Sequence, residues 1–274
     1  MKKVTNQNFY NYIDDILNFL EKYIDVTEIR KKYSETRYIL TDKEQNMIDV
    51  YKNKFISTKV GLNEGVTTVP IYELNGSYKI LNPICYVRNS ENNQELILNV
   101  MFHELMHVAS IKQTLENKET LVYDTGINKR IFRINGKYEE KYDNLNEAMT
   151  ELVAKVIYEN IYGKPYYIVV KKDENRFSSF YEKSYFLLAF LLLNYFEDHL
   201  SELFEIYFNN NIELLEKILN ENTNMNLEKL DKIVNKLQKN FISPIINSKY
   251  RKTIDILNKE NPIKNQEVLK EYML

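Results

Sequence analysis

The chain has 274 residues, of which 44% are hydrophobic and 28% charged, a balance typical of a folded globular protein rather than a disordered one. Its 37 basic and 39 acidic residues nearly cancel, so the charge gives no support to a nucleic-acid partner. The single cysteine excludes an intramolecular disulfide. The sequence shows neither a signal-peptide pattern nor an apolar run long enough to span a bilayer, so we expect a cytoplasmic protein.

The first part of the chain combines helices with a small sheet. Apolar residues at helical spacing predict a helix over residues 6–23, and a capping-box pattern predicts another over residues 41–55. Three short β-branched runs then predict strands at residues 66–74, 77–81 and 84–87. The pair Asn75-Gly76 predicts a hairpin turn between the first two strands. Cys85, in the third run, fits a small apolar strand residue better than a nucleophile.

The next segment, residues 94–112, predicts a helix that carries the pattern H-E-x-x-H from His103 to His107. Residues four apart share one face of a helix, so the two imidazoles can point at one metal ion. Glu104 is close enough to reach a water molecule held there. The pattern is typical of zinc hydrolases, in which two histidines bind the metal and the glutamate is the base. Histidines on helices are more often packed or solvated residues, but two of the chain's three histidines form this pattern, which argues against coincidence.

The rest of the chain is predicted to be mostly helical. The predicted elements are strands at residues 121–126 and 130–134, and helices over residues 145–162, 179–200 and, in several pieces, 201–274. The predicted fold class is therefore α+β and mainly helical, with a small mixed sheet before the H-E-x-x-H helix and a helical C-terminal part. We expect N-terminal helices at 1–60, a catalytic core at 61–200, and a C-terminal helical region at 201–274 that forms one compact unit with the core.

A candidate third ligand stands forty residues after His107, where Glu147 occurs in Asn-Glu-Ala-Met-Thr-Glu. Hydrolytic zinc sites use three protein ligands, and two histidines with one glutamate form one such set. Glu151 shares a helix face with Glu147, so one carboxylate can bind metal while the other accepts the second N–H of a ligating histidine. An open site favours Glu147 over Glu151 as the ligand. In the alternative structural role, Asn144 caps this helix and Glu147 bonds the cap.

These two motifs, in this order, resemble those of the gluzincin metallopeptidases, the group that includes thermolysin-like enzymes and the leukotriene-hydrolase-type aminopeptidases. Those enzymes have H-E-x-x-H on one helix and Asn-Glu-x-x-x-Asp/Glu on the next. The resemblance implies that His103, His107 and Glu147 bind one zinc ion. It also implies that Glu104 is the general base and that Glu151 is the acid that holds a ligating histidine. The chain is also similar to a group of uncharacterised bacterial proteins that pair H-E-L-x-H with Leu-Asn-Glu-x-x-Thr-Glu.

The resemblance covers about residues 65–200 and implies a zincin-like catalytic domain. The chain departs from the thermolysin-like pattern in the separation of the two motifs. Those of thermolysin-like enzymes are roughly half as far apart, and the extra length here corresponds to a hairpin-like segment at residues 121–142. This departure bears directly on the third ligand, because the insertion comes just before Glu147.

The resemblance implies a zinc-dependent metallopeptidase, in which Glu104 takes a proton from water as it attacks a peptide carbonyl. Related enzymes stabilise the resulting oxyanion with a tyrosine or a histidine, and the candidates here are Tyr181, Tyr185 and His199. We favour Tyr181, which lies near a predicted helix start. His199 fits better as a helix-end residue beside Asp198, where its charge interacts with the helix dipole.

The peptide or protein substrate is expected to pair with an exposed strand edge, formed by residues 66–71 or residues 84–87. Other functions remain open at this point. The chain could be a regulatory protease specific for one protein partner, or a toxin-like protease. It could also be a non-catalytic helical binding protein with a decayed or structural metal site. Closed structural zinc sites usually have four protein ligands and are often rich in cysteine, which argues against a structural ion in this chain.

Overall fold

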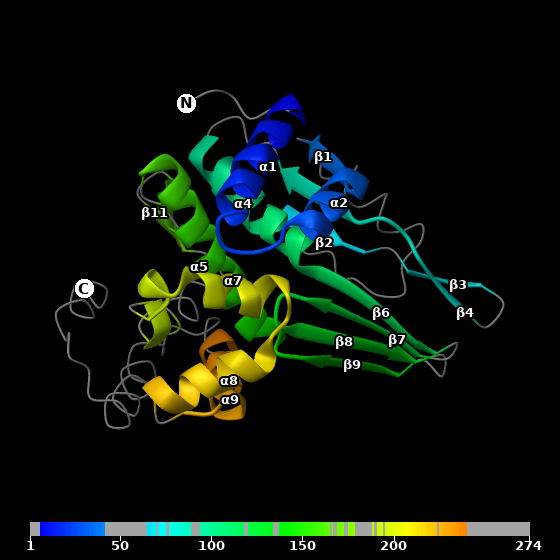
Figure 1. Cartoon of the computed structure of the whole chain (residues 1–274). Helices are drawn as coiled ribbons and strands as arrows, with labels where there is room; N and C mark the ends of the chain where they lie inside the picture. Colours follow the sequence, from blue (N-terminus) through cyan, green and yellow to red (C-terminus); the bar gives the residue numbers. More distant parts are fainter. Residues whose placement is uncertain are drawn as a thin grey trace.

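The computed structural model describes residues 6–41, 65–69, 71–74, 77–88, 94–117, 120–133, 137–164, 166, 169–172, 175–178, 188, 191–193, 195–223 and 225–239. Within these ranges helices and small sheets alternate, so the prediction of an α+β fold rich in helix is confirmed (Figure 1). None of the helices in these ranges combines the length and the apolar character needed to cross a membrane.

Two long helices form the centre of the structure. They are α4 (Gln94–Ser110), which carries the H-E-x-x-H pattern, and α5 (Asp143–Tyr162), which carries Glu147. The surrounding helices are α1 (Asn6–Leu20), α2 (Thr27–Glu35), α7 (Leu200–Phe208), α8 (Ile212–Asn222) and α9 (Leu227–Lys239). In Figure 1, α4 and α5 pack against each other; α2 packs against α4, and α1, α7 and α9 pack against α5.

The helix α4 is buried on almost all sides, because its sequence is apolar around most of its circumference. Its buried apolar residues are Ile97, Leu98, Met101, Phe102, Leu105, Met106, Val108 and Ala109. They belong to one core with apolar side chains of α1, α5, α7, α8 and α9. A helix held in this way has little freedom to move, so the polar side chains that it carries are fixed in direction.

The sheet before α4 is mixed, as the sequence predicts. It contains β1 (Arg37–Thr41), β2 (Gly65–Thr68) and β5 (Ile84–Arg88) in the order β1-β5-β2, with β1 parallel and β2 antiparallel to β5. Cys85 is buried in β5, as expected for a small apolar strand residue.

The position of β5 corrects one expectation about the substrate. Its residue Cys85 is paired with Tyr38 on one side and with Thr67 on the other. Residues 84–87 are therefore interior to the sheet and cannot offer an edge to a peptide. In the described part of this sheet, β2 is an outer strand, so of the two predicted edges only the one that begins at β2 is compatible with the fold.

The predicted strand over residues 66–74 is divided into two elements. Its first part is β2, and its second part, β3 (Ile71–Leu74), pairs instead with β4 (Ser77–Ile80) in an antiparallel hairpin. Pro70 and the predicted Asn75-Gly76 turn lie outside the described residues. The helix predicted for residues 41–55 also lies outside them except for Thr41, which belongs to β1. A second hairpin joins β10 (Val169–Lys172) and β11 (Asn175–Ser178).

The segment between the two long helices is a four-stranded antiparallel sheet rather than a simple hairpin. Its strands, in sheet order, are β6 (Ile111–Asn117), β7 (Thr120–Thr125), β8 (Asn128–Arg133) and β9 (Tyr138–Lys141). The sequence predicts β7 and β8. The sequence does not predict the outer strands β6 and β9. For β9 the reason is that it is exposed along its whole length and lacks the apolar alternation on which strand prediction depends.

The turn between β7 and β8 rests on α5. Gly126 has φ +58°, and a Cβ atom there would lie 2.3 Å from Oδ1 of Asn146. That oxygen accepts a hydrogen bond of 2.9 Å from the backbone N–H of Ile127. Asn146, the residue before Glu147, therefore fixes the inserted sheet against the helix that carries the candidate ligand.

Candidate metal centre

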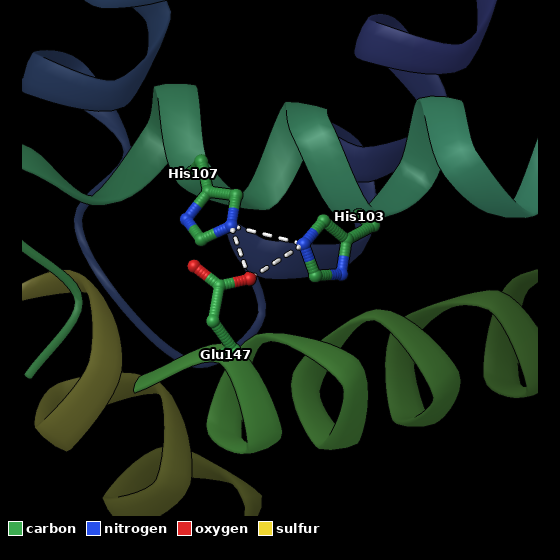
Figure 2. Close-up of side chains that lie close together, drawn as sticks. All are labelled: His103, His107 and Glu147. Atoms are coloured by element: carbon green, nitrogen blue, oxygen red, sulfur yellow. Dashed lines mark hydrogen bonds and ion pairs between the residues drawn. The ribbon is translucent and has the colours of Figure 1, made fainter. Parts of the chain in front are cut away.

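The imidazoles of His103 and His107 point in the same direction from α4. The two residues are one turn apart on this helix, and their Nε2 atoms lie 3.0 Å from each other. Figure 2 shows both rings directed toward α5, which runs opposite α4. The helical periodicity of the sequence therefore predicts this pair correctly.

The helix α5 brings Glu147 to the same point. Its Oε2 atom lies 3.2 Å from Nε2 of His103 and 3.3 Å from Nε2 of His107 (Figure 2). All three side chains are largely buried, with exposed fractions of 10–14%. Glu147, which is 40 residues from His107 and 44 from His103, thus meets both histidines at one position between the two helices.

The three distances fit a metal ion. A tetrahedral zinc ion with bonds of about 2.0–2.1 Å to nitrogen and oxygen holds its ligand atoms about 3.3–3.4 Å apart. The observed separations of 3.0, 3.2 and 3.3 Å approach the edges of such a tetrahedron. Direct hydrogen bonds would also permit distances of this size. In that case, however, two ring nitrogens and one carboxylate oxygen would compete for the same protons in one buried place, whereas a metal ion can bind all three at once.

The electrostatics of the cluster favour a cation. Burial raises the pKa of Glu147, but His107 and His103 outweigh this effect and hold it well below the ordinary value. Burial lowers the pKa of His103, but Glu151 and Glu147 outweigh burial and raise it well above the ordinary value. The two carboxylates therefore create a negative potential at the histidines, and a metal ion or protons can neutralise it.

Glu151 lies on the other side of His103. Its Oε1 atom is 3.4 Å from Nδ1 of His103, whereas Glu147 faces Nε2. A carboxylate beside Nδ1 favours the tautomer with the proton on that nitrogen, which leaves the Nε2 lone pair directed at the cluster. The two glutamates share one helix face but have different positions at the site. Glu147 belongs to the candidate ligand set, and Glu151 contacts His103 on the side of the ring that faces away from the cluster.

The alternative structural role for Glu147 is wrong. Asn144 does not cap the helix: α5 begins at Asp143, after Tyr142 with φ 64°, and no side chain caps it. The amide of Asn144 donates instead to Oδ1 of Asn235 in α9, at 2.7 Å. Without a cap at Asn144 there is no capping box for Glu147 to complete, and its carboxylate faces the histidines.

Glu104 is buried between α4 and β2. Its backbone carbonyl accepts a hydrogen bond of 3.1 Å from the hydroxyl of Thr67, and its Oε2 atom has no hydrogen-bond partner among the described residues. Burial raises the pKa of its carboxyl group above the ordinary value, while His103 and His107 act in the opposite direction. A buried carboxylate oxygen without a hydrogen-bond partner lowers the stability of the fold. Such an oxygen is therefore typical of a binding or catalytic site.

Gly65 is the residue of β2 that lies against Glu104. A Cβ atom at this position would be 2.5 Å from Cγ1 of Val100 and 2.8 Å from Cγ of Glu104. The strand can therefore approach the motif helix only with glycine at this position. No local pattern in the sequence indicates this role, because the contact depends on how the sheet packs against the helix.

We expect the substitution Gly65→Ala to reduce catalysis more than metal binding. The added methyl group must displace the Glu104 side chain or the strand, and a displacement of about 1 Å can cost roughly 100-fold in rate. The measurements are kcat/KM on a peptide and the zinc content of the same preparation. A variant with full activity would show that the position of Glu104 is not set by β2.

The helix α2 also holds the motif helix. The hydroxyl of Tyr33 donates to the carbonyl of Leu105 at 3.0 Å, and Nζ of Lys32 donates to the carbonyl of Ala109 at 3.0 Å. Together with the bond from Thr67 to Glu104, these contacts mean that side chains of α2 and β2 donate hydrogen bonds to backbone carbonyls of α4. The sequence did not predict α2, and none of these contacts can be inferred from local patterns.

Of the three candidates for the oxyanion-stabilising residue, the structure describes only His199. Tyr181 and Tyr185 lie outside the described residues. His199 lies just before α7, where its ring stacks on Tyr195 with centroids 4.4 Å apart. Its Nδ1 atom is 3.7 Å from Oε1 of Glu202. His199 is therefore an exposed residue at a helix end, as expected. It follows helical residues 195–198 but also stands at the N-terminus of α7, the end of a helix dipole that disfavours a charged histidine.

Comparison of the chain with models of known protein families, with curated proteins and with solved structures found no match. The arrangement of the site residues therefore carries the functional argument.

Proposed function

We propose that this chain is a zinc-dependent metallopeptidase of the gluzincin type, with a zincin-like catalytic domain. The observation that carries the proposal is the convergence of the Nε2 atoms of His103 and His107 with Oε2 of Glu147, at separations of 3.0–3.3 Å. Their spacing suits tetrahedral coordination by two imidazoles and one carboxylate.

The number and kind of side chains favour a catalytic metal over a structural one. Structural zinc sites are closed by four protein ligands, whereas catalytic sites have three and keep one position open. Within the described part of the chain, the group that could hold an ion contains three residues, and Cys85 is not one of them. Burial also raises the pKa of the Cys85 thiol well above its ordinary value, which disfavours the thiolate that a metal would require.

Glu104 is the candidate general base. When bound, zinc supplies Lewis acidity, which lowers the pKa of water toward about 7 and polarises a carbonyl group. Glu104 accepts the proton of the attacking water at a carboxylate oxygen and passes it to the departing amine. Among the described residues its Oε2 atom has no hydrogen-bond partner, so this oxygen is available to accept the proton.

The strand β2 is the candidate binding edge for an extended peptide. It pairs with β5 on one side and is outermost in the described part of the sheet. It also lies directly against α4 at Gly65 and Glu104. A peptide that pairs with this strand obtains backbone hydrogen bonds and passes beside the base.

The rate of hydrolysis is expected to fall in acid. Only the ionised carboxylate of Glu104 can accept a proton, so kcat/KM should decrease about tenfold per pH unit as the pH falls through the pKa of this group. Burial raises that pKa in the metal-free chain, whereas the charge of a bound zinc ion would lower it. Zinc content is measured at each pH, because protonated histidines also release metal. A kcat/KM that stays constant at every acid pH at which zinc is retained would contradict the role of Glu104 as the base.

Zinc analysis of the purified chain tests the metal itself. We expect one zinc ion per chain after dialysis against zinc and removal of the excess. A chain that does not retain zinc under these conditions would overturn the proposed function.

A further inference from the structure

Tyr166 follows the end of α5 and turns back onto it. The helix ends at Tyr162, and Gly163, with φ 59°, is its C-cap. Three residues after Gly163, the backbone N–H of Tyr166 donates to Oε1 of Glu159 at 2.9 Å. The ring of Tyr166 is 6% exposed and packs against Tyr158 with centroids 5.6 Å apart. Both the backbone and the ring of Tyr166 are therefore fixed.

The hydroxyl of Tyr166 lies behind the candidate metal centre, between the two long helices. It is 3.1 Å from Oε2 of Glu151 in α5 and 3.1 Å from the carbonyl oxygen of Asn99 in α4. Both neighbours are hydrogen-bond acceptors, so the single hydroxyl proton is shared between them. Asn99 is one helical turn before His103, and the other oxygen of Glu151 faces Nδ1 of the same histidine.

We propose that Tyr166 is a positioning residue of the metal centre and acts through Glu151. By binding Oε2, it holds the carboxylate so that Oε1 remains beside Nδ1 of His103, and this contact keeps Nε2 directed at the metal. The proposal rests on the proposed function, because it assumes that His103 is a ligand. It goes beyond that function in assigning a role to a residue that touches neither metal nor substrate.

A second buried tyrosine provides a matched control. Tyr33 also donates its hydroxyl to a backbone carbonyl of α4, that of Leu105 at 3.0 Å, and it is 2% exposed. Its hydroxyl therefore resembles that of Tyr166 in burial and in its bond to the motif helix, but it is not bonded to Glu151. A loss caused only by a missing hydrogen bond to α4 would appear in both phenylalanine variants.

The test compares Tyr166→Phe and Tyr33→Phe with the wild-type chain. The zinc dissociation constant is measured by competition with a chromogenic chelator, and the absorption spectrum of bound Co²⁺ reports the ligand geometry. Tyr166→Phe should weaken zinc binding by about 10-fold and alter the Co²⁺ spectrum, because residues that orient a ligand typically contribute 10–100-fold in metal affinity. Tyr33→Phe should change both much less, because the hydroxyl of Tyr33 is bonded to the motif helix but not to Glu151. Thermal unfolding of the metal-free proteins shows that both variants fold.

The Glu151→Gln background separates a positioning role from a general structural one. If Tyr166 acts through Glu151, Tyr166→Phe should have much less effect on zinc affinity once Glu151 has been replaced. An unchanged affinity for Tyr166→Phe would overturn the proposal, as would an equal loss in Tyr33→Phe or a full loss that persists in the Glu151→Gln background. A wild-type chain that does not bind zinc would instead overturn the proposed function.

Discussion

Replacement of Glu104 by Gln is expected to abolish most peptide hydrolysis while the protein keeps its zinc. The amide has the shape of the carboxyl group but cannot accept a proton from water. Loss of a general base typically reduces the rate by about 100- to 10,000-fold. The measurements are kcat/KM for a peptide substrate and zinc content, both made on the same sample. Zinc content should match the wild type, because Glu104 is not among the three side chains of the candidate metal group.

The stability of the Glu104→Gln variant provides its control. Glu104 is buried and its pKa is raised, which means that burial disfavours the charged carboxylate. Removal of that charge should leave the free energy of unfolding unchanged or increase it, so a loss of activity cannot come from unfolding. Equal turnover by the two proteins would contradict the assignment of Glu104 as the base.

Replacement of Glu147 by Gln is expected to weaken zinc binding far more than the same replacement at Glu151. Glu147 lies 3.2 and 3.3 Å from the two Nε2 atoms, whereas the contact between Glu151 and the histidine pair is at Nδ1 of His103. Loss of a ligand should exceed the roughly 10- to 100-fold loss that is typical of residues behind the ligands. The measurement is the zinc dissociation constant of each variant by chelator competition.

The two glutamates are well matched for this comparison. They lie one turn apart on α5, undergo the same chemical change, and are similarly buried, with side-chain exposures of 14% and 10%. A general effect of the substitution would therefore appear in both. Full zinc retention in Glu147→Gln, with loss in Glu151→Gln, would reverse the assignment of the third ligand.

The sequence predicts the centre of the candidate site because that part depends on helical periodicity. His103 and His107 are one turn apart, so any helix over this segment brings their rings together. The helix with Glu147 could also be predicted from its apolar spacing. The sequence favours Glu147 over Glu151 only through the general geometry of open zinc sites, because both carboxylates share one helix face. The offset between α4 and α5 decides which carboxylate reaches the Nε2 atoms, and it brings Glu147 there.

Other parts of the site depend on contacts between distant segments. Gly65 matters because β2 packs against α4, and Tyr166 matters because the chain reverses after Gly163. Neither contact leaves a periodic signal. In a chain with 22 tyrosines, the role of a single tyrosine cannot be recognised from composition or spacing. The strand β9 also depends on a distant contact. It has no buried face, and its place in the sheet comes from pairing with β8.

The most direct test of the central claim is the dependence of peptide cleavage on zinc. The purified chain is stripped of metal with a chelator and incubated with a mixed peptide library, and new peptide ends are detected by mass spectrometry before and after the return of one equivalent of zinc. We predict no cleavage by the metal-free chain and cleavage after zinc is returned. A chain that binds the zinc but leaves the library intact, or that cleaves it equally well without metal, would contradict the account.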